Sequence, residues 1–281
     1  KTPAYNFAKY FKVLPKQFIE SFTTRLWKRK ENLPSSVFEP KINPNTLLYK
    51  DLKKDMTPTD KDQPLLSFQI FLSDARGVPY PDQDPKKTDL QVMKREVRVS
   101  MYDTLTNSFI GNSAIVASIH NKSEPDTWKF NKWKSQVGTN PLIFTSKDAD
   151  VVIHGDVDLI FEFVIVCKGS NNATKDISCG FASLHLKEFK QFKNYVNAPS
   201  IKTLEIQGGS PDKPIPADEF DFKKDLGAWK KMTRGNIKSK ITIDLRYFNK
   251  MSAEGKFYIS MLPSTCIINK KLLHFLAGYR C

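Results

Sequence analysis

The sequence predicts a mainly β protein, an antiparallel β-sandwich of about eight strands with helical N- and C-terminal flanks. The first observation is that apolar and polar residues alternate over short segments between residues 65 and 250, and Gly, Pro, Asn and Asp separate these segments. The second is composition, since 40% of the 281 residues are hydrophobic and 26% are charged, as in globular domains and unlike disordered chains. No apolar run approaches the ~20 residues that a transmembrane helix needs.

Residues 1–64 are predicted to form a helical or irregular N-terminal arm and a connector. Aromatic residues recur at roughly helical spacing over residues 1–33, and Pro15 favours two short helices over one. Prolines between residues 33 and 64 predict a connector that lies on a surface. The arm is a candidate partner-docking element because its apolar set is unusually large for a monomer surface; the alternative is packing on its own sandwich. Its aromatic residues are Phe7, Tyr10, Phe11, Phe18, Phe22 and Trp27.

The sandwich is assigned to residues 65–250. Residues 159–167 are apolar on nearly both sides, which predicts a central strand covered on two faces. The other strands are expected to have one buried face, because their apolar residues alternate with polar ones. These strands are predicted at residues 68–73, 97–102, 111–119, 127–130, 142–144, 178–186, 201–207 and 241–247.

Three local features refine this assignment. Trp128 and Phe130 alternate with polar residues and are expected on the core face of their strand. Gly180 within a strand predicts a bulge or a close backbone approach, and residues 208–211 predict a tight turn. Residues 251–281 are expected to form a C-terminal helical segment of one or two helices, whose apolar side must be covered by the sandwich or by further chain.

The sequence contains no pattern that predicts catalysis, a cofactor or a metal ion. Phosphate-binding glycine loops, zinc-protease motifs and nucleophile elbows are absent, and the four histidines are isolated. The four cysteines lie far apart without a CxxC pair, which suits a reducing compartment, and Cys167 and Cys179 are expected to be packed and inert. We therefore predict that the protein is not an enzyme. Because the chain starts at Lys1 without Met or a signal peptide, we expect a piece of a longer cytoplasmic protein.

Two segments resemble a known sandwich. Leu66–Pro79 is similar to the opening strand and first loop of a C2 domain, and Leu159–Val166 is similar to the strand that leads into its third loop. In calcium-binding C2 domains that strand ends in a pair of aspartates. Here the sequence continues with Cys167 and Lys168, so a thiol and a cation stand where carboxylates would be needed. The resemblance therefore implies a C2-like sandwich that does not depend on calcium.

A narrower resemblance covers residues 41–265 and rests on short motifs in a fixed order. The most specific are the Ser-Cys-Gly-aromatic strand and the Gly-Gly-Ser-Pro turn. The motifs are Ile42–Asp51, Gly77–Pro81, Val97–Asp103, Pro125–Phe130, Asp158–Phe163, Ile177–Leu184, Leu204–Pro211 and Ile259–Thr265. Together they resemble the C-terminal homology region of the nephrocystin-1 family. The resemblance implies a non-catalytic, cytoplasmic scaffold at the ciliary base and transition zone, with a nephrocystin-4-like protein and other ciliary scaffold proteins as partners.

The chain carries 44 Lys and Arg against 30 Asp and Glu, a formal net charge of +14. This excess is spread over many segments, as solvated faces would be. The alternative function is calcium-independent, peripheral binding to an anionic membrane surface, where lysines and interleaved aromatic residues would contact headgroups. Nucleic acid is disfavoured, since no RNP motif, zinc finger or helix-turn-helix pattern is present. The candidate anionic-surface contacts are Lys129, Lys132, Trp133, Lys134, Lys187, Lys190 and Lys193.

Overall fold

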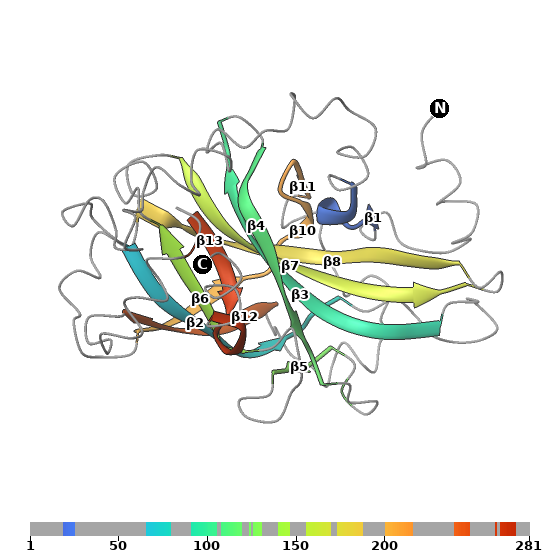
Figure 1. Ribbon diagram of the computed structural model, residues 1–281. Coiled ribbons are helices and arrows are strands. Elements are labelled where there is room, and N and C mark those ends of the chain that lie inside the picture. Colours follow the sequence, from blue (N-terminus) through green and yellow to red (C-terminus); the bar gives the residue numbers. More distant parts are fainter. Residues whose placement is uncertain are drawn as a thin grey trace.

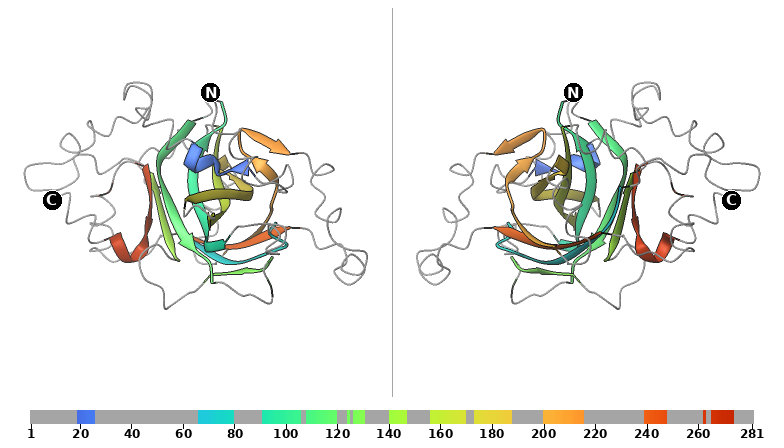
Figure 2. Two further views of the ribbon diagram at one scale, coloured as in Figure 1. Left: turned by 90° about the vertical axis from the view of Figure 1, so that its right-hand side faces the viewer. Right: turned by 90° about the vertical axis from the view of Figure 1, so that its left-hand side faces the viewer.

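The architecture is that of a mainly β protein with two antiparallel sheets around one core (Figure 1). The computed structural model describes residues 19–25, 66–79, 91–105, 108–119, 124, 126–130, 140–146, 156–169, 173–187, 200–215, 239–247, 262 and 265–273. Within them the mainly β, antiparallel prediction is confirmed. Figure 2 shows the sheets curving around the core as a curled half-barrel.

One sheet, here called the β7 sheet, has five strands in the order β1-β8-β7-β3-β4. Its central strand β7 is buried on both sides over most of its length, as the apolar run at residues 159–167 predicts. The strands are β1 (Ile19–Glu20), β3 (Gln91–Asp103), β4 (Ser108–Ala117), β7 (Val157–Lys168) and β8 (Thr174–His185).

The second sheet, here called the β2 sheet, runs in the order β13-β6-β2-β12-β9, and β5 pairs with β2 at one end. A separate hairpin is formed by β10 and β11. The strands are β2 (Leu66–Arg76), β5 (Trp128–Lys129), β6 (Leu142–Ser146), β9 (Ser200–Glu205), β12 (Lys240–Tyr247) and β13 (Thr265–Asn269), with β10 (Gly208–Ser210) and β11 (Lys213–Ile215) in the hairpin.

The core lies between the two sheets and is filled by the apolar members of the alternating strands. Trp128 is fully buried and meets the ring of Phe163 edge-on at 5.4 Å between centroids, while Phe68 stacks on Phe144 at 4.5 Å. Phe130 is buried in the same cluster, so the predicted core face of this segment is confirmed. Burial of this apolar surface is the main driving force that holds the sheets together.

Two contacts close the seams between the sheets. On one side the Asn112 side chain of β4 donates to the carbonyl of Ile267 at 2.7 Å and accepts from its amide at 3.0 Å, as a neighbouring strand would. On the other side the backbones of Phe181 and Gln207 exchange two hydrogen bonds of 2.9 and 2.7 Å. Gly180 permits that second contact: its φ is +116°, and a Cβ atom there would lie 2.4 Å from the Gln207 carbonyl oxygen. The predicted close backbone approach is therefore confirmed.

The structure corrects the prediction for the C-terminal segment. Residues 265–269 form strand β13, paired with β6, where a helix was expected, and among the described residues a short 3₁₀ turn, Lys270–Leu272, follows it. The β2 sheet thus extends beyond residue 250. Residues 208–210, expected as part of a tight turn, are the first strand of a hairpin, and the turn itself lies at residues 211–212. The rest of the predicted helical flanks lies outside the described residues, apart from β1 and a helical turn at residues 22–25.

Candidate functional site

The outer face of the β7 sheet, which points away from the core, is covered by residues 19–25 (Figure 2). We call these residues the 19–25 segment. On β3 the core residues Val97 and Val99 alternate with Glu96 and Arg98, which would face solvent if the sheet were bare. Instead Glu96 is 8% exposed and Arg98 is 3% exposed. The segment therefore turns a polar sheet face into a buried, charged site.

The segment first joins the sheet as a strand. In β1, Ile19 pairs with Ser178 and Glu20 with Ile177 of β8, in antiparallel register. The next amide, that of Ser21, donates to the carbonyl of Asp176 at 2.9 Å. This is strand addition at a sheet edge, a common way for a sheet to bind a peptide, because main-chain hydrogen bonds supply affinity independently of sequence.

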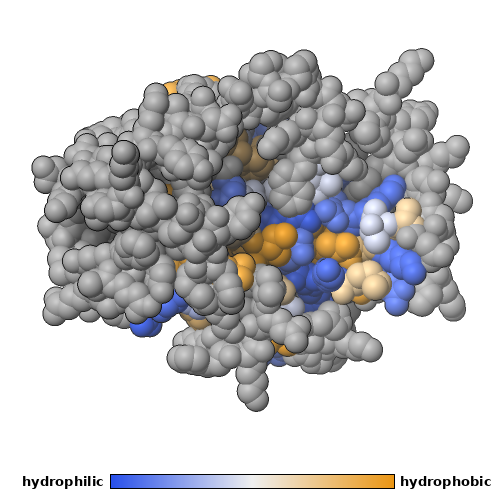
Figure 3. All heavy atoms as spheres, viewed as in Figure 1, coloured by the Kyte–Doolittle hydropathy of each residue, from blue (hydrophilic) through white to orange (hydrophobic). Residues whose placement is uncertain are grey.

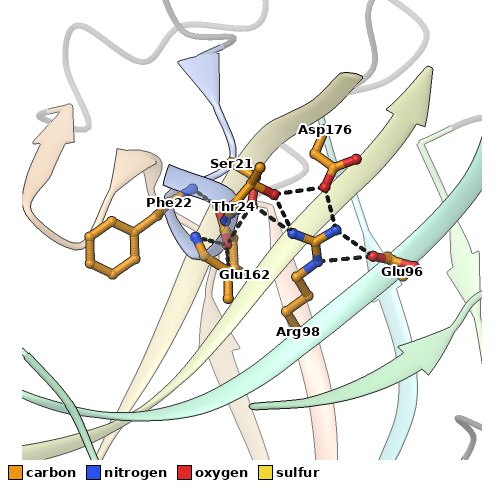
Figure 4. Close-up of polar contacts among 8 residues, drawn as sticks. Ser21, Phe22, Thr24, Glu96, Arg98, Glu162 and Asp176 are labelled. Carbon is orange, nitrogen blue, oxygen red and sulfur yellow. Dashed lines mark hydrogen bonds and ion pairs between the residues drawn. The ribbon is translucent and has the colours of Figure 1, made fainter. Parts of the chain in front are cut away.

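The Glu162 carboxylate then caps the helical turn at residues 22–25. It accepts the backbone amides of Phe22 at 2.6 Å and Thr23 at 3.0 Å, and the hydroxyls of Ser21 at 3.1 Å and of Thr23 (Figure 4). The Ser21 oxygen also accepts the amide of Thr24, as an N-cap serine does. Glu162 is 1% exposed, so these donors replace the water that a buried carboxylate would otherwise need.

Arg98 fixes the same turn from β3. Its Nη1 donates to the hydroxyls of Thr24 at 2.6 Å and Ser21 at 3.2 Å, and its Nη2 donates to Asp176 at 2.7 Å. Both Nε and Nη2 donate to Glu96, at 2.9 and 2.7 Å. Burial alone would lower the pKa of Arg98, but the hydrogen bonds and charges of Asp176 and Glu96 raise it above its ordinary value. The guanidinium therefore stays charged and holds a fixed direction.

An apolar pocket receives the side chain of Phe22. Its ring meets Tyr102 at 5.5 Å and Phe109 at 5.2 Å between centroids, both edge-on, and Ile160 and Phe181 complete the cluster. Phe22 is 3% exposed. Because this cluster is separate from the sandwich core, Phe22 anchors the segment without belonging to the main core.

Arg25 ends the segment on the β10–β11 hairpin. Its guanidinium donates to Asp212 at 3.1 and 3.3 Å and to the Ser210 hydroxyl at 2.8 Å, and it lies over the Phe22 ring. Burial would raise the pKa of Asp212, but the Ser210 hydrogen bond and the charge of Arg25 lower it below its ordinary value. The pair therefore adds a charged contact at the rim of the site.

The predicted candidate residues are only partly described. Of the six arm aromatics, Phe22 is buried in cis, so this part of the arm packs on its own sandwich; Phe7, Tyr10, Phe11, Phe18 and Trp27 lie outside the described residues. Lys129 and Lys187 are exposed, 3.9 Å from Glu124 and 2.6 Å from Asp156 respectively. The remaining candidates, Lys132, Trp133, Lys134, Lys190 and Lys193, also lie outside the described residues.

On the face seen in Figure 3, the described residues form no patch of a single kind. Figure 3 shows polar and apolar side chains intermixed on the coloured part of the face. Within the described part of the chain, no group of three or more His, Cys, Asp or Glu could hold a metal ion. No helix there has the length and apolar character to cross a membrane. Cys167 and Cys179 are buried, and burial raises the pKa of Cys167 to about 12 and that of Cys179 well above its usual range.

Sequence reasoning missed the charged cluster beneath the segment. The available signal was Glu162, a carboxylate inside the most apolar strand of the chain, since a charge covered on both faces needs buried partners. The Ser-Phe-Thr-Thr-Arg run at residues 21–25, with an N-cap serine first, was a second signal. Neither signal shows that the two belong together, because 140 positions separate Phe22 from Glu162.

The fold and the site define a mainly β protein whose sheet holds a short segment of its own chain through a strand pair, an aromatic anchor and buried charges. The chain matches no protein-family model, and no curated protein is significantly similar to it.

Proposed function

We propose that the chain is a non-catalytic protein-interaction module, and that the outer face of the β7 sheet is its docking site for short peptide segments. The observation that carries this proposal is the way residues 19–25 are held. They use strand addition to β8, an aromatic side chain in a pocket, and charged hydrogen bonds to Glu162 and Arg98. These are the elements by which sheets recognise extended peptides.

The site suits recognition better than catalysis. Glu162 and Arg98 are each saturated by hydrogen bonds that fix their positions, and both described thiols of the β7 sheet, Cys167 and Cys179, are protonated at neutral pH. A catalytic carboxylate or thiol needs access to a substrate and an unsaturated position. Fixed charges and a filled aromatic pocket instead give sequence selectivity to a bound peptide.

We further propose that this module is the C2-like part of a ciliary scaffold related to the nephrocystin-1 family, acting at the ciliary base or transition zone. Its support is the colinear order of the motifs. The two most specific of them also contact each other, since Phe181 of one bonds the backbone of Gln207 of the other. Gly180 and Gly209 both have positive φ, so each motif contains a glycine at a position where other residues would strain the backbone.

Two measurements test this function. Calorimetry with purified chain and a nephrocystin-4-like protein should give association at micromolar concentration or tighter, and the tagged full-length protein should gather at the ciliary base. Lack of association, together with a signal elsewhere in the cell, would overturn the scaffold assignment. Sedimentation with anionic liposomes over a salt series tests the alternative membrane function, for which Lys129 and Lys187, each close to a carboxylate, offer no specific support.

A further inference from the structure

We propose that the 19–25 segment is an exchangeable ligand, and that the same site binds a partner peptide of like chemistry when the segment leaves. This inference rests on the proposed docking function. The occupant is a peptide that presents two residues for strand pairing, then serine, an aromatic residue, two threonines and arginine. Each requirement follows from one contact of the present occupant.

The strand pair and the hydroxyls set the first requirement. Among the described residues of the segment, Ile19 and Glu20 pair with β8, so the entering backbone presents these two extended residues before the chain turns. Ser21 must then be able to donate to Glu162 while it accepts from Arg98. A hydroxyl does both from one oxygen atom, whereas a carboxamide donates and accepts from two separate atoms and an apolar side chain of similar size does neither.

Charge complementarity sets the second requirement. The guanidinium of Arg98 pairs with the carboxylates of Glu96 and Asp176, while Glu162 lies on the other side of the Ser21 hydroxyl. Asp212 adds a further negative charge at the rim. The bound segment carries both Glu20 and Arg25, and Arg25 is the residue that meets Asp212 at the rim. A partner peptide with a cation at the position of Arg25 is therefore favoured, and one with an acidic residue there is repelled.

The separation of the two apolar clusters makes exchange physically reasonable. Phe22 packs only with the outer cluster, and the sandwich core contains no residue of the segment. The exposed face left behind would be a sheet surface of alternating polar and apolar residues, which water can solvate. Departure of the segment is therefore a local opening and does not require the sandwich to unfold.

The tether determines how strongly the segment competes. The 40 residues numbered 26 to 65 join the segment to β2. A covalent tether of this kind gives effective concentrations up to about millimolar, so a free peptide of equal affinity is largely excluded while the segment is intact. The apparent Kd for a partner peptide therefore rises in proportion to the ratio of molecules with the segment docked to molecules with the site open.

The test uses the full 281-residue chain and a labelled peptide with the sequence of residues 17–27. Phe22→Asp in the chain should undock the segment, because it would bury a carboxylate in the aromatic pocket. Fluorescence anisotropy should then show that this variant binds the peptide at least ~10-fold more tightly than the unaltered chain does. Ile201→Asp, at an exposed position on β9, is the matched control and should behave like the unaltered chain. A peptide that itself carries Phe22→Asp should bind neither the unaltered chain nor either variant chain.

Equal peptide binding by the Phe22→Asp chain and the unaltered chain, with the variant folded by circular dichroism, would overturn the inference. Should the variant fail to fold, hydrogen exchange on the unaltered chain decides. The amides of Phe22 and Thr23 should exchange at least ~10-fold faster than those of Phe161 and Phe163 on β7. Exchange at the same rate would show a permanently fixed segment and overturn the proposal.

The two proposals fail in different ways. If a nephrocystin-4-like protein does not associate but the opened chain binds the peptide, the scaffold assignment falls and the exchangeable segment stands. If that protein binds the unaltered and Phe22→Asp chains with equal affinity, the interaction module stands and the exchangeable segment falls.

Discussion

Arg98 on β3 and Glu162 on β7 are register partners in neighbouring strands, and both bond the same hydroxyl, that of Ser21. A basic and an acidic side chain of the sheet are thereby linked through a residue that lies far away in sequence. This arrangement makes the docking of the 19–25 segment depend on two charges, and it leads to measurable consequences.

Glu162→Gln should destabilise the docked segment. The backbone amides of Phe22 and Thr23 donate to different oxygens of Glu162, and glutamine would replace one of these oxygens with an NH2 group, so one amide would lose its acceptor in a buried position. We expect a loss of about 1–3 kcal/mol in the free energy of unfolding, measured by urea denaturation. Glu124→Gln, at an exposed position, is the control and should stay within about 0.5 kcal/mol. Equal losses for the two variants would contradict the role assigned to Glu162.

Gly180→Ala should be strongly destabilising. The added Cβ would lie 2.4 Å from the Gln207 carbonyl oxygen, and the φ of +116° is unfavourable for alanine. Strain and the lost seam contact together should cost more than ~3 kcal/mol, detected as a lower thermal midpoint. Gly209→Ala, at a φ of +77°, should cost about 1 kcal/mol. A Gly180→Ala protein as stable as the original would contradict this prediction, because the backbone contact between Phe181 and Gln207 would then accommodate the added Cβ atom without cost.

Asp212 should make docking sensitive to acid. Its pKa is lowered in the folded protein, so its contribution is fully present above the unfolded pKa, near 3.9, and is lost as the pH falls through the lower folded value. Asp212→Asn should therefore lower the urea midpoint at pH 7, and its effect should shrink as the pH falls below about 3.9. Because both side chains of the pair are 25% exposed, we expect less than ~1 kcal/mol. In an Arg25→Met background most of the pH 7 effect should disappear.

The buried thiols should be unreactive in the folded protein. With the pKa of Cys167 at about 12 and that of Cys179 well above its usual range, almost no thiolate exists at pH 8. In a Cys281→Ser chain, Ellman's reagent should leave Cys167, Cys179 and Cys266 unmodified for hours and label all of them in guanidinium chloride. Rapid labelling of Cys167 or Cys179 without denaturant would mean that the β7 sheet opens far more often than its packing implies.

The strands of the sandwich could be predicted because their signal is local. Phe68, Ile70 and Leu72 bury one face of β2, and the same period of two identified the core faces of β3 and β12. The C-terminal strand could not be identified in this way. Ile267 and Ile268 are adjacent apolar residues buried on opposite sides of β13, one in the main core and one in a second cluster, so they give no clean alternation. Their assignment depends on β6, which is distant in sequence.

The site was less predictable for the same physical reason. The aromatic residues of the arm were identified from their spacing, and Phe22 is indeed an anchor, but its pocket is assembled from β3, β4, β7 and β8. Glu162 was visible as a charge within an apolar strand, yet its donors lie in another segment. Long-range pairing of polar groups leaves no periodic signal in a sequence, so it follows only from the folded chain.

The pairing of β1 with β8 also has a consequence for solubility. β8 is the next strand inward from β1 at this end of the β7 sheet, so without β1 the backbone amides and carbonyls of residues 176–178 would lose their neighbours. Bare edges of this kind recruit strands from other molecules and promote aggregation. A chain shortened to begin after residue 25 should therefore self-associate as its concentration rises. The short N-terminal strand thus protects the sheet against uncontrolled growth at this edge.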